Sequence, residues 1–156
     1  MNIYLLTHQR ELERKTNTGV LVANVLGENC SVFEWSRVNP SKVLLNKIES
    51  ESVALVYPCE DSRALAESCD GFDSFIIIDA TWQEAQKMYN HSPYLKQLPK
   101  VSMRSNIASI YTLRRNQKEH GLCTAECASE VLKSCGFLNK AENIESRLAG
   151  FITNMS

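Results

Sequence analysis

The feature that most constrains the fold of this chain is a regular alternation of short apolar segments with segments of helical spacing. Four segments have the length and composition of strands, namely residues 3–6, 31–36, 53–57 and 75–78. Each of them leads through a turn into a helical pattern. Such an alternation predicts an α/β fold, with a mostly parallel sheet that carries helices on both faces.

The helical segments are marked by apolar residues at helical spacing and by turn-forming residues at their ends. They cover residues 20–26, 41–49, 61–69, 82–89, 124–134 and 143–152. Two further segments, residues 98–101 and 110–113, have the character of strands. Because no linker or internal repeat divides this pattern, we expect residues 1–156 to form a single domain.

Composition limits the class of protein. Apolar residues make up 44% of the chain and charged residues 22%, as in an ordinary globular protein. No apolar stretch approaches the ~20 residues that a membrane helix requires. The apolar run at residues 3–6 is also too short for a signal peptide. We therefore expect a cytoplasmic protein that does not enter a membrane.

The six cysteines do not have the spacing of a metal site. None of them belongs to a Cys-x-x-Cys pair, and the three histidines lie far apart in the sequence. In a cytoplasmic protein, thiols are ordinarily kept reduced. We therefore predict free cysteines and no bound metal.

The charge is unevenly distributed, although the net charge is only −1. Residues 85–118 contain no acid, while the rest of the chain holds ten basic and eighteen acidic residues. A local basic segment of this kind favours RNA phosphate as a partner, and a solvated face with acids nearby in space is the plainer explanation. The candidate RNA-binding residues are Lys87, Lys96, Lys100, Arg104, Arg115 and Lys118, and Arg114 is the seventh basic residue of the segment.

A carboxylate follows directly after the most apolar strand, in the sequence Asp79-Ala80-Thr81-Trp82. The carboxyl end of a central strand is where open α/β sheets place their ligands, and burial there would make Asp79 a better base. A purely structural carboxylate in the turn is the alternative.

Thr81 and Glu84 have the spacing of a capping box. Trp82 belongs either to the core or to the wall of a pocket that stacks on a base.

Three other polar segments begin helices or follow strands. Residues 16–19 (Thr-Asn-Thr-Gly) form a turn with hydroxyl and amide groups that suit a carboxylate or a phosphate. Residues 57–61 (Tyr-Pro-Cys-Glu-Asp) end a predicted strand and start a predicted helix, and residues 123–126 (Cys-Thr-Ala-Glu) open another predicted helix. The adjacent Arg114 and Arg115 suit a phosphate or a carboxylate, or else form a solvated pair.

In combination, these segments resemble the DTW-domain family. Residues 79–85 (Asp-Ala-Thr-Trp-Gln-Glu-Ala) are similar to the signature of this family. The family's other motifs have counterparts in the same order, with His8 and Glu11 ahead of the first: residues 16–19, 58–61, 87–93, 111–114 and 123–126. The resemblance extends from His8 to about residue 128. One departure is that the cysteine cluster found at the N-terminus of many members is missing here, so no zinc-dependent role is carried over.

The resemblance implies both a fold and a reaction. The family is similar to SPOUT-class proteins, which implies a trefoil knot in the C-terminal half. Its bacterial members include tRNA-uridine aminocarboxypropyltransferases. That implies transfer of the 3-amino-3-carboxypropyl group from S-adenosylmethionine to N3 of a tRNA uridine, with release of 5′-methylthioadenosine. The alternatives are a SPOUT-like RNA methyltransferase and a noncatalytic RNA-binding or cofactor-sensing module. The sequence leaves the oligomeric state open.

The same resemblance assigns roles to particular residues. Asp79 would deprotonate the uracil N3, and Trp82 would stack on the target base or wall the cofactor. Arg114 would hold the carboxylate of the donor, and Glu126 or Asp61 its ammonium group. The residues expected to bind S-adenosylmethionine are Asn17, Thr18, Gly19, Tyr57, Pro58, Glu60, Asp61, Thr81, Tyr111, Leu113, Arg114, Thr124 and Glu126.

Overall fold

A six-stranded sheet with the strand order β2-β1-β5-β3-β6-β4 forms the centre of the computed structural model, which describes residues 1–103 and 122–155. Every strand pair in these two ranges is parallel, as the sequence predicts. The strands are β1 (Asn2–Thr7), β2 (Cys30–Glu34), β3 (Val53–Val56), β4 (Arg63–Ala64), β5 (Ser74–Asp79) and β6 (Lys100–Ser102).

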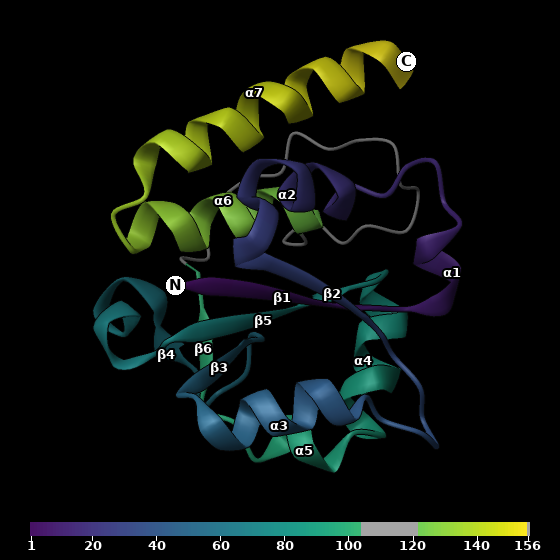
Figure 1. Ribbon diagram of the computed structural model, residues 1–156, viewed down its shortest axis with the longest axis vertical. Helices are drawn as coiled ribbons and strands as arrows, with labels where there is room; N and C mark the ends of the chain where they lie inside the picture. The colour runs from purple at the N-terminus through teal and green to yellow at the C-terminus, as the bar shows by residue number, and fades with distance from the viewer. Residues whose placement is uncertain (104–121, 156) are drawn as a thin grey trace.

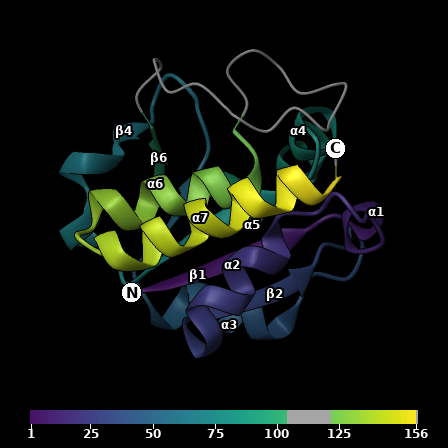
Figure 2. The ribbon, with the colours of Figure 1, turned by 90° about the horizontal axis from the view of Figure 1, so that it is seen from above.

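Helices cover both faces of this sheet, which gives three layers (Figure 1). One face carries α2 (Gly19–Leu26), α6 (Thr124–Ser134) and α7 (Leu138–Met155), which lie together above the strands in Figure 2. The other face carries α3 (Lys42–Ser50), α4 (Trp82–Asn90) and α5 (Pro93–Lys96). The short helix α1 (Gln9–Leu12) follows β1 at one edge. The α/β class expected from the sequence is confirmed.

Both faces of the central strands are apolar, because each face packs against helices. In β1, the side chains of Ile3 and Leu5 enter the core beneath α2, α6 and α7. The alternate residues Tyr4 and Leu6 enter the second core, beside α3, α4 and α5. The period of two along the strand therefore divides its side chains between the two cores.

Local signals in the sequence fix several helix ends. Ser41 caps α3, where its hydroxyl accepts a hydrogen bond from the Leu44 N–H (3.3 Å). Gly136 follows α6 with a positive φ of 87°, a conformation that glycine adopts without steric cost. The Phe137 N–H then returns to the Leu132 carbonyl (2.8 Å) and closes the end of the helix.

The helix predicted for residues 61–69 is wrong. Residues Arg63–Ala64 instead pair with β6 as the edge strand β4, so their backbone groups bond to the sheet. Two turns of 3-10 helix follow, at Leu65–Glu67 and Cys69–Gly71. Only Leu65 of the 3-10 segments is buried, so the segment lacks the continuous apolar stripe that holds a helix on a sheet.

Two other elements have bounds that differ from the predicted ones. The strand predicted for residues 98–101 is β6 (Lys100–Ser102), which begins after Pro99, a residue without an N–H to donate to the ladder. The last helix is longer than residues 143–152 and spans Leu138–Met155. The strand predicted for residues 110–113 lies outside the described residues. The trefoil knot stays a prediction, because the described residues do not show one.

The prediction that all cysteines are reduced is wrong for one pair. Cys69 and Cys135 form a disulfide, with their Cα atoms 5.4 Å apart. The two residues are separated by 66 positions in sequence, and the packing of α6 beside the Leu65–Glu67 turn brings them together. Sequence spacing alone does not indicate such a pairing. Four cysteines of the described chain are free: Cys30, Cys59, Cys123 and Cys127.

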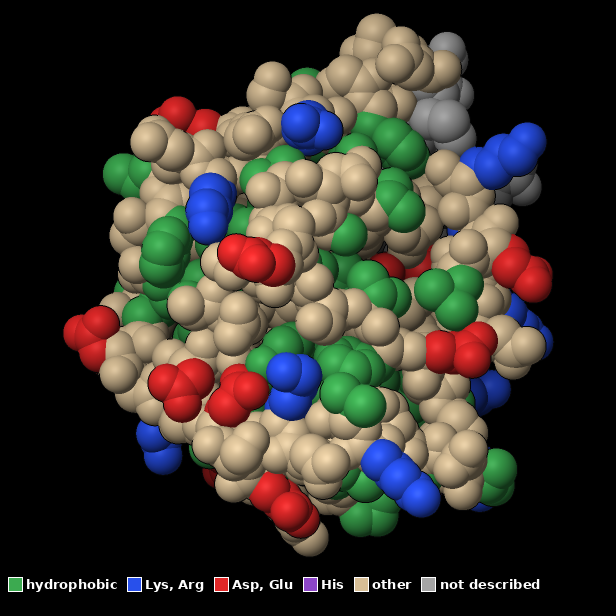
Figure 3. Space-filling view, viewed as in Figure 1, with side chains coloured by type: hydrophobic (Ala, Val, Ile, Leu, Met, Phe, Trp, Pro, Cys, Tyr) green, Lys and Arg blue, Asp and Glu red, His purple; other side chains and the backbone are tan. Residues whose placement is uncertain are grey.

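The described residues contain neither a membrane-spanning helix nor a cluster of metal-binding side chains. Within residues 1–103 and 122–155, no helix is both long and apolar enough to span a membrane. The same part of the chain holds no group of three or more His, Cys, Asp or Glu side chains arranged to bind a metal ion. Acidic and basic side chains are interspersed over the face of the molecule seen in Figure 3.

Candidate active site

The polar segments singled out in the sequence meet at the carboxyl edge of the sheet, around Asp79. Asp79 ends β5, and its pairing partner Thr7 ends the neighbouring β1. The backbone carbonyl of Asp79 accepts a hydrogen bond from the His8 N–H (3.1 Å), which fixes the turn that follows β1. The site is therefore built on the ends of two central, fully paired strands.

The carboxylate of Asp79 joins three separate parts of the chain. It is 1% exposed. Its Oδ1 accepts from the Thr124 hydroxyl (2.7 Å), and both oxygens accept from the Asn17 amide (3.1 and 2.9 Å). The Thr7 hydroxyl lies 3.5 Å from Oδ2. Asp79 thus holds the turn before α2 and the start of α6 against the sheet.

Gly19 is required by the close approach of α2 to this carboxylate. A Cβ atom at position 19 would lie 2.5 Å from Asp79 Oδ2, inside the contact distance of any real side chain. The same atom would lie 3.2 Å from the Asn17 amide oxygen. The Gly of the Thr-Asn-Thr-Gly segment is therefore a packing requirement of the Asp79 site.

A second bond ties the same turn to the start of α6. The buried Thr18 hydroxyl accepts a hydrogen bond from the Ala125 N–H (3.1 Å). At the same helix end, the Glu126 carboxylate accepts a hydrogen bond from the Cys123 N–H (3.1 Å), as in a capping box. Burial raises the pKa of the Cys123 thiol to about 12, so this cysteine is a neutral thiol at physiological pH. The segments at 16–19 and 123–126 are thereby locked to each other.

A partly buried network of hydrogen bonds and ion pairs extends from Asp79 toward α4. The Asn17 amide that bonds Asp79 also donates to Glu11 (3.0 Å). Glu11 in turn pairs with Arg14, and Arg14 forms a bidentate pair with Glu84 at 3.1 and 2.9 Å. This chain of contacts connects α1 and the turn before α2 to the first turn of α4.

The capping box predicted for α4 is confirmed. The Glu84 N–H donates to the Thr81 hydroxyl (3.2 Å), and the Thr81 N–H donates to the Glu84 carboxylate (3.0 Å). Burial alone would raise the pKa of Glu84, but the bonds from Arg14 and Thr81 outweigh it and lower this pKa to about 2. Glu84 is therefore an anion throughout the physiological range.

Three aromatic rings stack beside this network. Tyr57, directly after β3, lies 6.0 Å from Trp82 and 4.2 Å from Tyr89 between ring centroids, with interplanar angles of 17° and 13°. Trp82 and Tyr89 are seven residues apart, about 10 Å along the axis of α4, so Tyr57 lies between them. The Lys100 ammonium lies 5.6 Å from the centroid of the Tyr89 ring.

On the other side of the α4 N-terminus, His8 stacks on Trp35, which follows β2. Their ring centroids are 6.1 Å apart at an interplanar angle of 22°. His8 Nδ1 accepts from the Arg10 N–H (3.1 Å) and lies 3.8 Å from Glu84 Oε2. The Trp35 indole N–H donates to the buried Ser92 hydroxyl (2.8 Å). The aromatic groups therefore flank Asp79 along the same edge of the sheet.

The structure brings together only part of the predicted set. Asn17 and Thr124 bond to Asp79, Gly19 packs against it, and Thr18 bonds to the start of α6. The side chains of Asn17, Thr18 and Thr124 are buried and bonded within the protein. Tyr57 and Thr81 lie close by, whereas three residues of the turn after β3 are exposed: Pro58, Glu60 and Asp61. Six of the predicted residues fall outside the described ones: Arg104, Tyr111, Leu113, Arg114, Arg115 and Lys118.

Sequence reasoning missed several residues of this site. Arg14 lies in a polar segment and carries no motif signal, yet it pairs with both Glu11 and Glu84. Tyr89 could have been found from its spacing of seven residues from Trp82, which puts both rings on one helix face. Thr7 and Trp35 carry no such signal, because each acts through a partner far away in the sequence.

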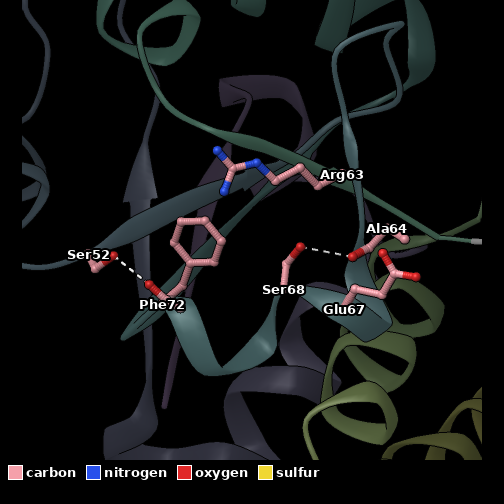
Figure 4. A pocket seen from close by; sticks show the side chains of 7 residues that line it. Ser52, Arg63, Ala64, Glu67, Ser68 and Phe72 are labelled. Carbon is pink, nitrogen blue, oxygen red and sulfur yellow. Dashed lines mark hydrogen bonds between the residues drawn. The ribbon is translucent and has the colours of Figure 1, made fainter.

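A separate cavity lies away from these residues. It has a volume of about 620 Å³ and is lined by Ser52, Arg63, Ala64, Glu67, Ser68, Gly71 and Phe72 (Figure 4). Ser52 directly precedes β3 and Phe72 shortly precedes β5, so the cavity opens at the amino edge of the sheet. It shares no residue with the Asp79 site.

The parallel sheet, its two helical layers and the polar site at the strand ends define the class of open α/β proteins that bind ligands at the carboxyl edge. The whole chain, residues 1–156, matches the family model described as the DTW domain. The protein belongs to the DTW-domain family.

Three curated relatives carry the name tRNA-uridine aminocarboxypropyltransferase 2. The one from Drosophila melanogaster is 29% identical over 83% of this chain and 54% of its own length. Those from Macaca fascicularis and Mus musculus are 25% and 24% identical, over 84% of this chain and 46% of their own lengths. The chain therefore spans about half the length of the curated relatives it matches.

A solved structure shares the fold. The SAM-dependent rRNA:acp-transferase from Vulcanisaeta distributa superimposes with a TM-score of 0.60 at 14% identity. The match covers 98% of this chain and 76% of that one. The arrangement of the sheet and helices is thus common to both proteins.

Proposed function

We propose that this protein transfers the 3-amino-3-carboxypropyl group of S-adenosylmethionine to N3 of a uridine in tRNA, and releases 5′-methylthioadenosine. The convergence of two motif segments, residues 16–19 and 123–126, and of Thr7 at the end of β1 on the buried Asp79 carboxylate is the observation that carries this proposal. Such a junction holds loops in fixed positions at the edge of the sheet where open α/β proteins bind their ligands. The relatives named as aminocarboxypropyltransferases support the choice of reaction.

The residues at this edge fit the chemistry of the proposed donor. S-adenosylmethionine would supply an electrophilic carbon and a neutral thioether leaving group. The Tyr57 and Trp82 rings offer flat apolar surface to an adenine or a uracil base. The exposed Glu60 and Asp61 offer carboxylates to an ammonium group, within the turn directly after Tyr57.

In the proposed reaction, the uracil N3 gives its proton to a base, for which Asp79 is the predicted candidate. The bond from N3 to the donor carbon then forms as the bond from that carbon to sulfur breaks, and sulfur keeps the electron pair in 5′-methylthioadenosine. The chain's contribution is orientation: the turn at 16–19 and the start of α6 are fixed to each other and to the sheet through Thr18 and Asp79. Such fixed geometry lowers the entropic cost of bringing the reacting atoms into line.

The role of Asp79 follows from its surroundings. Its two oxygens already accept hydrogen bonds from Asn17 and Thr124, and its side chain is buried. These contacts support a positioning role, in which the carboxylate orders the loops around the donor. A general-base role for Asp79, in which it takes the proton of N3, stays a prediction that the variants described below test.

Basic residues on α4, α5 and β6 supply the proposed contacts to tRNA phosphates. Lys87, Lys96 and Lys100 lie in a stretch that contains no acid. Their ammonium groups would displace counterions from the RNA backbone, so binding should weaken steeply with added salt. We place this protein in the cytoplasm, where tRNA is available.

Nucleoside mass spectrometry of tRNA from cells that lack the protein tests the proposed reaction. We expect loss of the nucleoside that carries the aminocarboxypropyl mass and its return when the wild-type chain is supplied. Return with an Asp79→Ala variant would contradict the role of the Asp79 site. Loss of a methyl group instead would identify a methyltransferase, and an unchanged nucleoside profile would leave a noncatalytic RNA-binding module.

A further inference from the structure

We propose that the exposed face of α4 reads the bases of unpaired RNA nucleotides next to the target uridine. Three amide side chains, Gln83, Gln86 and Asn90, form this face, and we call them the amide strip. The proposal rests on the proposed function, because it takes the target to be a uridine held at the Asp79 site. Nothing in the motifs of the family signature requires amides at positions 86 and 90.

The burial pattern of α4 puts the three amides on one side of the helix. Gln83, Gln86 and Asn90 are exposed, while Ala85 and Met88 are buried against the sheet. The spacings of three and four residues bring side chains onto the same helix face. The strip is therefore a continuous surface of hydrogen-bond donors and acceptors that face solvent.

The strip starts at the proposed active site and leads away from it. The helix α4 begins at Trp82, three residues after Asp79 and directly after the Thr81 cap. From Gln83 to Asn90 the strip extends about 10 Å along the helix axis. Stacked nucleotides rise about 3.4 Å each along a strand, so the strip matches two to three nucleotides beside the target.

The ring stack lies along the same helix. Trp82 and Tyr89 project from α4 on either side of Tyr57, and all three rings are partly buried. Aromatic groups next to amides are the combination that holds unpaired bases, because rings stack on the base faces and amides bond to the base edges. The stack also links α4 to the end of β3, which holds the backbone of the helix in place beside the sheet.

The charge around the strip suits RNA. From Ala85 to Lys100 the chain contains three lysines and no acid. Lys87 is exposed on α4, and Lys100 lies above the Tyr89 ring. With Lys87 on the same helix as the uncharged amide strip, phosphates can be held beside it while bases meet the amides.

Unpaired nucleotides are the form of RNA that this surface fits. In a paired A-form helix the Watson–Crick edges are occupied by pairing, the major groove is too deep and narrow for side chains, and proteins contact mainly the phosphates and 2′-hydroxyls. In a loop the Watson–Crick edges are free, and an amide can donate and accept at once, as an Asn or Gln does toward adenine. A paired stem would meet only the lysines.

Fluorescence anisotropy with two labelled RNAs tests the proposal without any transfer reaction. One RNA is a stem-loop with a uridine and its neighbours unpaired, and the other is a duplex in which the same sequence is fully paired. The test variant carries Gln86→Ala and Asn90→Ala together. The matched control is Asn139→Ala, which removes an exposed amide from α7 on the opposite face of the sheet.

We expect the wild-type chain and the control to bind the stem-loop more tightly than the duplex and to discriminate between loops that differ beside the uridine. The double variant should lose about tenfold in affinity for the loop and most of this discrimination, with duplex binding unchanged. Equal affinities for the loop in all three proteins would overturn the proposal. Equal weakening toward loop and duplex would also overturn it, because the strip would then contribute only to backbone binding.

The result of this binding experiment can be distinguished from success or failure of the proposed transfer reaction. A chain that binds the loop through the amide strip but transfers nothing would support the strip and contradict the reaction. A double variant that binds every loop like the wild type, in a chain that does transfer the group, would contradict the strip alone. Circular dichroism of the double variant checks that α4 is intact, as expected for exposed substitutions.

Discussion

Asp79 shows what a single residue contributes to this molecule. The sequence predicts its position at the end of a buried strand, and the structure confirms that position. Its partners could not be predicted from spacing, because Asn17 and Thr124 lie 62 and 45 residues away in the chain. Only the parallel order of the strands and the packing of α2 and α6 bring them to one carboxylate.

Replacing Asp79 tests its role as a junction. We expect Asp79→Ala to lower the free energy of unfolding by about 2–4 kcal/mol, because the buried donors of Asn17 and Thr124 lose their acceptor. Urea denaturation measures this loss. Asp70→Ala, at an exposed aspartate, is the matched control and should leave the free energy of unfolding almost unchanged.

The variant Asp79→Asn separates positioning from proton transfer. A positioning carboxylate predicts that this change weakens S-adenosylmethionine binding together with stability, because the turn at 16–19 is released. A general base predicts unchanged binding and a large loss of kcat alone. Isothermal titration with S-adenosylmethionine beside single-turnover kinetics distinguishes the two.

Gly19 offers a test of the close approach at the same carboxylate. We expect Gly19→Ala to destabilise the protein by about 1–3 kcal/mol, because the added methyl group would overlap with Asp79 Oδ2 in a packed site. Gly150→Ala is the matched control. Position 150 lies in α7 with open space around it, so alanine should stabilise that helix by about 1 kcal/mol. Thermal denaturation that ranks the two variants in the reverse order would contradict this account.

At the scale of elements, the sequence predicts well where local chemistry decides the structure. The capping box of α4 and the start of α6 follow from residues three positions apart, and both are confirmed. The predicted helix at 61–69 fails because β6, which is distant in sequence, offers the backbone of Arg63–Ala64 a strand partner. Propensity is overridden there by tertiary pairing.

The ion pair at the α4 cap predicts a dependence of stability on pH. The pKa of Glu84 is lowered from 4.5 to about 2 in the folded protein. The ionised Glu84 therefore stabilises the folded protein fully when the pH is above the pKa of this group in the unfolded chain. The stabilisation is lost as the pH falls toward its pKa in the folded protein. We expect Glu84→Gln to lower the free energy of unfolding by about 2 kcal/mol at neutral pH.

As the pH falls toward the folded pKa of Glu84, the difference in free energy of unfolding between the wild type and Glu84→Gln should disappear. The wild type should lose this stabilisation between about pH 5 and pH 2, whereas Glu84→Gln should lose less over the same interval. Urea denaturation at several pH values measures both curves. Glu142→Gln, at an exposed position of α7, is the control, and a pH dependence that it shares with Glu84→Gln would refute this assignment.

At the scale of the whole molecule, the alternation of strands and helices predicts the parallel sheet and its two helical layers, and both are confirmed. That alternation does not predict the order of the strands or which distant side chains meet. Both depend on which packing of the elements buries the most apolar surface. The disulfide between Cys69 and Cys135 belongs to this class of feature.

The disulfide predicts a response of the whole chain to reduction. It closes a loop across 66 positions, so its removal should lower the free energy of unfolding by about 2–4 kcal/mol. We expect Cys69→Ala to melt at a lower temperature than the wild type and to be insensitive to dithiothreitol. Cys59→Ala removes an exposed free thiol and should melt like the wild type with and without reductant. Identical melting of wild type and Cys69→Ala would contradict the pairing.

The central claim is that the site around Asp79 delivers the aminocarboxypropyl group, and not the methyl group, of S-adenosylmethionine to RNA. Its most direct test is incubation of the purified chain with unmodified tRNA and donor labelled either in the carboxyl carbon or in the methyl carbon. We predict that label from the carboxyl carbon enters the tRNA and that methyl label leaves in 5′-methylthioadenosine. Methyl label in the tRNA, or no label from either donor, would contradict the claim.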